Sequence, residues 1–242
     1  MIKLINLTKS YGKFTAVNGI DLEVHPGEIF GFLGPNGAGK TTTLKMMAGL
    51  LQPTSGSVSI GGFDVRTQPL QAKRITGFIP DRPYLYEKLT ATEFMQFVAK
   101  LYDMSGPDER IRELLDLFGL TDWAGELIEN FSHGMKQRLV MASSLLHTPK
   151  VLVVDEPMVG LDPRGARLVK DIFRDLASGG ATIFMSTHTL EIVEKMCTRV
   201  AIINLGNIIA EGSVDELGRM ARMENSPLEP IFLKLTGGDE VA

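Results

Sequence analysis

The sequence predicts an α/β fold: a mixed β-sheet around a glycine-rich loop, an antiparallel β-layer near the N-terminus and an inserted helical subdomain. Short apolar segments alternate with turns over residues 2–60, as in paired strands. Over 82–131, apolar residues recur with a helical period. Strand and helix patterns then alternate from 135 to 203, which favours parallel strands joined by helices.

The N-terminal layer is predicted from turn residues and from alternation. Tyr11-Gly12-Lys13 and His25-Pro26-Gly27 are typical of turns between strands. Val58 and Ile60 alternate with serines, which predicts a strand with one buried face. A helix is expected over 41–51, after the glycine-rich loop.

The inserted segment, expected at 82–131, contains two helical repeats separated by Gly106-Pro107. Each repeat places apolar residues at i, i+3, i+4 and i+7, once from Phe94 to Leu101 and once from Ile111 to Phe118. The aromatic residues of this segment form either its small core, which is the commoner outcome, or a groove for a partner. They are Tyr84, Tyr86, Phe94, Phe97 and Tyr102.

The second half of the chain alternates between the two patterns. Helices are expected over 135–147, 165–177 and 190–196, and strands over 151–154, 181–185 and 200–203. A short helical tail is expected over 213–242. With 242 residues, of which 44% are hydrophobic, the chain can bury a large core. We therefore expect one domain spanning 1–242, with the 82–131 subdomain inserted in it.

Composition and charge restrict the possible partners and the cellular location. The 25 Lys and Arg against 29 Asp and Glu give a formal net charge of −4, and the basic residues form no stripe. Nucleic acid is therefore not expected as a partner. The single cysteine, Cys197, is expected inside a helix as a small buried residue, and it allows no internal disulfide, which suits a reducing cytosol. No apolar run approaches the ~18 residues of a membrane span. We expect a cytoplasmic protein which, if it serves a membrane, does so from outside the bilayer.

A phosphate-binding loop is the most specific motif. Residues 34–41 read Gly-Pro-Asn-Gly-Ala-Gly-Lys-Thr after an apolar run, which matches G-x-x-x-x-G-K-[ST] between a strand and a helix. Glycines let backbone N–H groups face phosphates, and the following helix adds the positive end of its dipole. Lys40 supplies a charge for the β- and γ-phosphates of ATP, and Thr41 a hydroxyl for Mg²⁺. The predicted nucleotide-binding residues here are Gly34, Pro35, Asn36, Gly37, Ala38, Gly39, Lys40, Thr41 and Thr42.

A pair of acids completes the predicted site. The β-branched run 151–154 predicts a buried parallel strand, and Asp155-Glu156 follows it directly. Open α/β sheets bind ligands at the carboxyl ends of their strands. Asp155 is therefore predicted to hold Mg²⁺, directly or through water. Glu156 is predicted to face the γ-phosphate and to polarise or deprotonate a water molecule.

With these motifs in place, the chain resembles the ATP-binding cassette (ABC) ATPases, the nucleotide-binding subunits of ABC transporters. The discriminating segment is 131–138, Phe-Ser-His-Gly-Met-Lys-Gln-Arg, which resembles the family's L-S-G-G-Q signature and lies shortly before the second acidic strand. Ser132 is a natural helix N-cap, and the free N–H groups beyond it can bind a phosphate. The resemblance implies that Ser132, His133 and Gly134 contact ATP held by the opposite subunit.

Three smaller elements agree with the family pattern. Tyr11 precedes the phosphate loop where the family stacks an aromatic ring on adenine. His188, in Ser186-Thr187-His188, resembles the histidine that contacts the γ-phosphate. Residues 160–163, Gly-Leu-Asp-Pro, resemble the loop that crosses the dimer interface, and they also suit the start of a helix. The resemblance extends from Ile2 to about Gly212.

Two positions depart from the pattern. Asp81 stands where the family has a glutamine that senses Mg²⁺ and the membrane partner, so Asp81 either holds Mg²⁺ or only transmits motion. His133 replaces a glycine and Met135 a glutamine. His133 either adds a donor near the phosphate or merely tolerates the backbone angle.

The resemblance implies a function. Two copies would enclose two ATP molecules, with Lys40 holding phosphate, Thr41 and Asp155 organising Mg²⁺, and Glu156 and His188 acting in hydrolysis. ATP hydrolysis would drive a separate membrane permease on the inner face of the cell membrane. Within the family the chain most resembles ATPases of ABC-2-type exporters. Two alternatives stay open: a soluble ABC ATPase that acts on DNA or ribosomes, and an ATP-gated binding module with negligible turnover.

Overall fold

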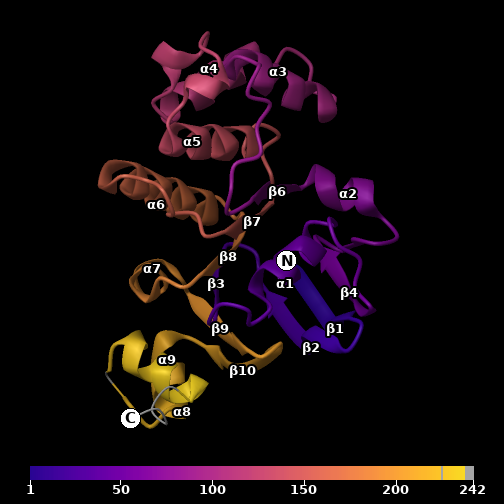
Figure 1. Ribbon diagram of the computed structural model, residues 1–242, viewed down its shortest axis with the longest axis vertical. Helices are drawn as coiled ribbons and strands as arrows, with labels where there is room; N and C mark the ends of the chain where they lie inside the picture. The colour runs from indigo at the N-terminus through magenta and orange to yellow at the C-terminus, as the bar shows by residue number, and fades with distance from the viewer. Residues whose placement is uncertain (225, 238–242) are drawn as a thin grey trace.

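Two β-sheets form the framework of the computed structural model, which describes residues 1–224 and 226–237 (Figure 1). An antiparallel sheet of order β2-β1-β4-β5 comprises β1 (Ile2–Tyr11), β2 (Phe14–Val24), β4 (Ser55–Ile60) and β5 (Phe63–Asp64). A six-stranded sheet of order β10-β9-β3-β8-β7-β6 comprises β3 (Ile29–Leu33), β6 (Thr76–Ile79), β7 (Val151–Asp155), β8 (Thr182–Thr187), β9 (Arg199–Asn204) and β10 (Asn207–Gly212). The predicted α/β fold, with a mixed sheet and an antiparallel N-terminal layer, is confirmed.

The six-stranded sheet is mixed because β10 pairs antiparallel with β9, whereas the pairs among β9, β3, β8, β7 and β6 are parallel. Every residue of β3, β7 and β8 is buried, as expected of parallel strands covered on both faces. The register pairs Leu33 with Thr187 and Asp155 with Ser186. The carboxyl ends of β3, β8 and β7 therefore meet at one edge of the sheet.

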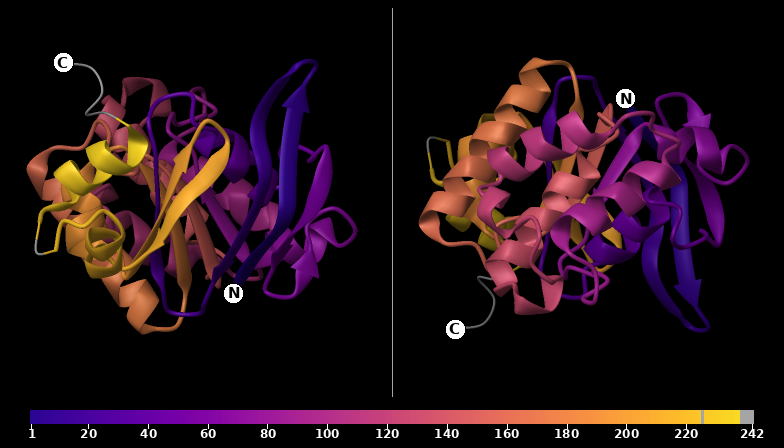
Figure 2. Two further views of the ribbon diagram at one scale, coloured as in Figure 1. Left: turned by 90° about the horizontal axis from the view of Figure 1, so that it is seen from below. Right: turned by 90° about the horizontal axis from the view of Figure 1, so that it is seen from above.

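Helix α1 (Lys40–Met47) packs between the two sheets, where its Leu44, Met46 and Met47 join one apolar cluster with residues of both. The helix ends earlier than the predicted 41–51, because Gly49 adopts a φ of 66°. Short helix α2 (Pro69–Arg74) precedes β6. Figure 2 shows the antiparallel strands and the C-terminal helices on opposite sides of the six-stranded sheet.

Between β6 and β7 the chain is mostly helical and lies at the top of Figure 1. It forms α3 (Ala91–Leu101), α4 (Asp108–Leu117), the 3₁₀ turns η1 (Thr121–Trp123) and η2 (Ile128–Asn130), and α5 (His133–Ser144). A capping box between Thr90 and Glu93 begins α3. Helix α5 starts before the predicted 135 because the Ser132 hydroxyl accepts a hydrogen bond from Met135 N. The division into a subdomain at 82–131 stays a prediction.

The aromatic side chains of this segment divide between core and surface. Phe94 is buried, but Tyr84 is 80% exposed and Tyr86 is 61% exposed. The core interpretation is therefore wrong for these two tyrosines. Leu85 and Leu89 pack against the apolar cluster in their place, so the segment before α3 turns its leucines inward and its tyrosines to solvent.

Two further helices and a C-terminal pair of helices complete the fold. They are α6 (Pro163–Ser178), α7 (Leu190–Met196), α8 (Val214–Met220) and α9 (Leu228–Thr236). Helices α7, α8 and α9 share an apolar cluster with strands β9 and β10. Of the tail predicted at 213–242, residues 225 and 238–242 lie outside the described residues. Cys197 lies one residue beyond the end of α7 rather than inside it. In the part of the chain that is described, no helix has the length and apolar character needed to cross a bilayer.

Candidate functional site

The loop between β3 and α1 bends at glycines that no other residue could replace without strain. Gly39 precedes α1 with a φ of 111°, and a Cβ at this position would lie 2.4 Å from Ala16 O. A Cβ on Gly34 would lie 2.3 Å from Ile203 O. The loop is therefore packed closely against β2 and the end of β9. Its residues Asn36, Gly37 and Gly39 line a cavity that Lys40 also lines, described below.

Lys40 begins α1 and folds back over the loop. Its Nζ donates to Gly34 O at 2.6 Å and to Pro35 O at 3.1 Å. Burial lowers the pKa of this ammonium, while the carboxylates of Glu156 and Asp155 raise it. The ammonium is thus held beside the loop, between two backbone carbonyl groups and two carboxylates. From this position it could bind a phosphate in the loop.

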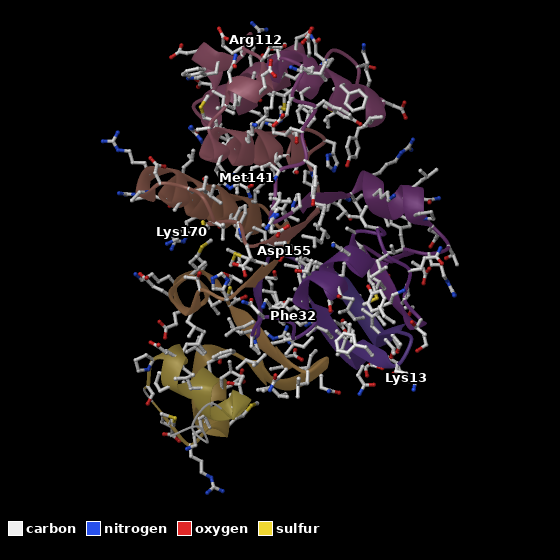
Figure 3. The ribbon with its side chains drawn as sticks, viewed as in Figure 1. Lys13, Phe32, Arg112, Met141, Asp155 and Lys170 are labelled. Atoms are coloured by element: carbon white, nitrogen blue, oxygen red, sulfur yellow. The ribbon has the colours of Figure 1, made fainter. Side chains whose placement is uncertain are left out.

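Asp155 ends β7 near the centre of the molecule (Figure 3) and is 3% exposed. Burial raises the pKa of its carboxyl; hydrogen bonds with Ser186 and Thr41 act against this, and the charges of Asp81 and Glu156 add to it. The three residues predicted to serve a metal, Thr41, Asp81 and Asp155, therefore lie together. Hydroxyl and carboxylate oxygens are the donors that Mg²⁺ takes, so this set fits the ion.

Glu156 is fixed by three partners from β8 and the turn after it. Its N–H donates to Ser186 O, and its Oε2 accepts from the Thr187 hydroxyl at 3.1 Å. Its Oε1 lies 2.7 Å from Nδ1 of His188. The residue adopts a φ of 50°, an uncommon angle for a side-chain-bearing residue. At this turn the carboxylate lies against His188 and Thr187.

These groups share a cavity of about 420 Å³. It is lined by Tyr11, Phe14, Ala16, Asn36, Gly37, Gly39, Lys40, Thr41, Thr42, Asp81, Asp155, Glu156 and His188. Phe14 and Ala16 were not predicted. The two-residue turn after Tyr11 was the available signal, because it pairs Tyr11 with Phe14 across the hairpin and so brings Phe14 to the same end of the sheet.

The predicted residues Ser132, His133 and Gly134 line a different cavity, of about 620 Å³, which shares no residue with the first. Two helix N-termini meet there. Ser132 caps α5, and the Asp162 carboxylate caps α6 by accepting from Gly165 N at 2.8 Å. The structure thus places the predicted site residues in two separate groups, each lined by helix N–H groups suited to anions.

A third hollow, of about 260 Å³, lies between the end of α1 and helices α2, α3 and α5. Its lining includes Leu50, Val98 and Tyr102. The Tyr102 ring stacks on His147 with centroids 3.8 Å apart, and His147 Nε2 lies 3.2 Å from Thr76 O. Neither the place of Leu50 in this hollow nor the stacking of His147 on Tyr102 was predicted, because both residues come from segments distant from the aromatic run.

Comparisons with known proteins agree with the geometry. The family model described as ABC transporter matches residues 17–159. The chain is 39% identical over 219 residues to the linearmycin resistance ATP-binding protein LnrL of Bacillus subtilis (strain 168), over 90% of this chain and 70% of that protein. It is 40% identical over 218 residues to the daunorubicin/doxorubicin resistance ATP-binding protein DrrA of Streptomyces peucetius, over 89% of this chain and 66% of that protein.

Solved structures give the same result. The structure of an ATP-binding subunit of an ABC transporter matches with a TM-score of 0.93 and 31% identity, over 98% of this chain and 99% of that chain. A dimeric ATP-binding cassette in a post-hydrolysis state, bound to ADP and Pi, matches with a TM-score of 0.82 and 26% identity, over 88% of this chain and 98% of that chain.

Proposed function

The chain belongs to the ABC transporter family as an ATP-binding and ATP-hydrolysing subunit, and from this premise we propose that two copies enclose ATP and power export through a separate membrane permease. The observation that carries the proposal is the placement of Glu156, between His188 and Thr187 and in one cavity with Lys40 and Asp155. One cavity thus holds a cation for phosphate, oxygen donors for a metal and a carboxylate suited to activate water.

Each residue has a distinct role in the proposed hydrolysis. Lys40 and the loop N–H groups hold the phosphates, and Glu156 orients or deprotonates the attacking water, with His188 fixing the carboxylate. Mg²⁺, held by Thr41 and Asp155 with Asp81 nearby, would neutralise phosphate charge during the transfer. Tyr11 and Phe14 would form the wall that meets the base. Positioning and charge account for the chemistry, so no covalent enzyme intermediate is expected.

The second cavity supports a dimer. Ser132 lines a cavity separate from the one that Lys40 lines, so a ligand that needs both must draw them from two subunits. We propose an isologous dimer in which each Ser132 faces the ATP held by the other chain's Lys40. ATP then links the subunits, and turnover per subunit rises with protein concentration.

Analytical ultracentrifugation tests this arrangement. The Glu156→Gln chain should sediment as a dimer with ATP and as a monomer without it. Adding Ser132→Arg should abolish the ATP-dependent dimer through bulk and charge, while ATP binding by the monomer persists. A dimer that survives in the double variant contradicts the proposal, as does a specific activity that is independent of protein concentration over a range in which the protein without ATP is monomeric.

The third hollow supports the permease contact, which would also place the chain at the inner face of the cell membrane. It is lined mainly by apolar residues, it includes the 62% exposed Leu50, and the segment before α3 exposes Tyr84 and Tyr86. A helix end of the permease would dock there.

Leu50→Cys should cross-link to an integral membrane protein in native membranes, and Lys13→Cys, on the far turn of the antiparallel sheet, serves as the matched control. Equal capture by both variants would contradict the contact.

A further inference from the structure

His133, the first residue of α5, and Gly160, in the turn before α6, are in direct contact. A Cβ built on Gly160 would lie 2.2 Å from His133 Cδ2 and 2.5 Å from His133 Nε2. The imidazole therefore covers the α-carbon of Gly160, where only glycine leaves room for it. A Cβ on Gly134 would in turn lie 3.1 Å from Gly160 O, so the start of α5 is packed closely against this one residue.

Gly160 belongs to the turn that begins at Glu156. Val159 N donates to Glu156 O at 3.2 Å, and Leu161 N donates to Met158 O at 3.3 Å. These two bonds close consecutive turns over 156–161, with positive φ angles of 50° at Glu156 and 79° at Gly160. The segment that joins Gly160 to Glu156 is short, and both of its ends adopt restricted backbone angles. A displacement of Gly160 therefore also moves the backbone of Glu156.

We propose that His133 is a positioning residue that holds the 156–161 turn, and with it the Glu156 carboxylate, against the N-terminus of α5. The inference rests on the proposed function, in which α5 faces one ATP and Glu156 acts on the other. The contact then links the two ATP sites within each chain: ordering α5 by a nucleotide phosphate fixes the acid of the other site.

This role differs from that of a phosphate donor. A donor needs a ring N–H directed at the ligand, whereas a positioning role needs only a flat side chain of sufficient size above Gly160. The two roles are separated by His133→Phe, which keeps the ring and removes the donor, and by His133→Gly, which removes both.

The first experiment measures ATP hydrolysis as kcat, KM and Hill coefficient for the whole chain. His133→Gly should lower kcat about fivefold and bring the Hill coefficient toward one, with a smaller change in KM. His133→Phe should recover most of kcat. Parent kinetics in His133→Gly, or loss of activity in His133→Phe equal to that in His133→Gly, overturns the inference.

The second experiment is a double-mutant cycle on the contact itself. Gly160→Ala forces the ring aside and should lower kcat about tenfold or more, but it should cost only about two- to threefold in a His133→Gly background, where the ring is gone. Gly180→Ala is the matched control, since Gly180 also has a positive φ, of 91°, and no atom within 4 Å of its built Cβ. It should lower the melting temperature by about 2–4 °C through backbone strain and leave kcat unchanged. Equal losses for Gly160→Ala in both backgrounds overturn the inference.

Sedimentation of the Glu156→Gln chain with ATP separates the two proposals. If the Glu156→Gln chain does not form an ATP-dependent dimer, the proposed function has failed. The inference then fails too, because it needs ATP sites that are built from residues of both subunits. If the dimer forms but the cycle shows no coupling, the inference alone is wrong. The proposed function then stands without it.

Discussion

His188 Nδ1 lies 2.7 Å from Oε1 of Glu156, and the histidine side chain is 60% exposed whereas that of the glutamate is 16% exposed. The pair spans the boundary of the cavity, with the acid inside and the imidazole at its mouth. His188 thus orients the Glu156 carboxylate from the solvent side, and its imidazole is also free to contact a phosphate that enters the cavity.

Glu156→Gln should bind ATP with near-parent affinity and lose turnover by about 10²–10⁴-fold, because the amide keeps the shape of the acid but cannot accept a proton. Phosphate release and nucleotide binding measured on the same preparation check this. Glu191→Gln, which removes an exposed acid paired with Lys195 on α7, is the matched control and should retain parent turnover. Activity of Glu156→Gln within about twofold of the parent would show that another group activates water.

Asp81→Asn separates two roles for Asp81. This carboxylate raises the pKa of Asp155, which places its charge near the predicted metal donors. If it holds Mg²⁺ or a water on the ion, the amide variant should need a several-fold higher Mg²⁺ concentration for half-maximal ATP hydrolysis. Asp122→Asn, in η1, is the control. An unchanged Mg²⁺ titration would assign Asp81 to communication with the permease instead.

His147→Phe should reduce the dependence of stability on pH. Burial lowers the pKa of the His147 imidazole, although its hydrogen bond to Thr76 O opposes this. In the unfolded chain the imidazole titrates at about 6.5. Between the folded and unfolded pKa values the unfolded state binds more protons, so this contribution to stability is complete above about 6.5 and is lost as pH falls through the folded pKa. Phe keeps the stack on Tyr102 without a proton to bind.

Thermal unfolding at pH 7.5 and pH 5.5 checks this sign. The melting temperature of the parent should fall more between the two values than that of His147→Phe. Equal falls, or a larger fall in the variant, would show that His147 does not contribute to acid destabilisation.

Cys197 should resist thiol reagents in the native protein. Burial raises the pKa of its thiol to about 12, so almost no thiolate exists at pH 8. An Ellman titration should find no reactive thiol before denaturation and one afterwards. Lys13→Cys, in the turn between β1 and β2, should add one thiol that reacts at once. Rapid reaction of the unmodified native chain would contradict a raised thiol pKa at this partly buried position.

The architecture followed from local sequence because its signals are short-range. The β-branched run 151–154 forms β7, and the glycine-rich loop leads into α1 as expected. The predicted limits of helices were less accurate, since capping by Ser132 and the turn at Gly49 each move a helix end by a few residues. The predicted roles of the site residues stay predictions.

What the sequence could not provide depends on contacts between distant segments. No local pattern places the imidazole of His133 over Gly160, because α5 and the turn after β7 are adjacent only in the folded chain. The exposure of Tyr84 and Tyr86 was also not predictable, since aromatic residues near a helical repeat more commonly form a core. The position of Phe14, by contrast, follows from the register of the β1–β2 hairpin, which pairs Phe14 with Tyr11.

Strands β6 and β7 are neighbours in the sheet, with Ile79 paired to Val154, although the whole of α3 to α5 lies between them in sequence. The chain therefore leaves the sheet and returns to it at the same place. Helices α3 and α4 contribute no residue to the nucleotide cavity, so exchanges within these two helices should leave the strand order and that cavity intact. Under the proposed function, one ATP-hydrolysing core could be fitted to different membrane partners by changes in α3 and α4 alone, and an engineer could graft these two helices between relatives.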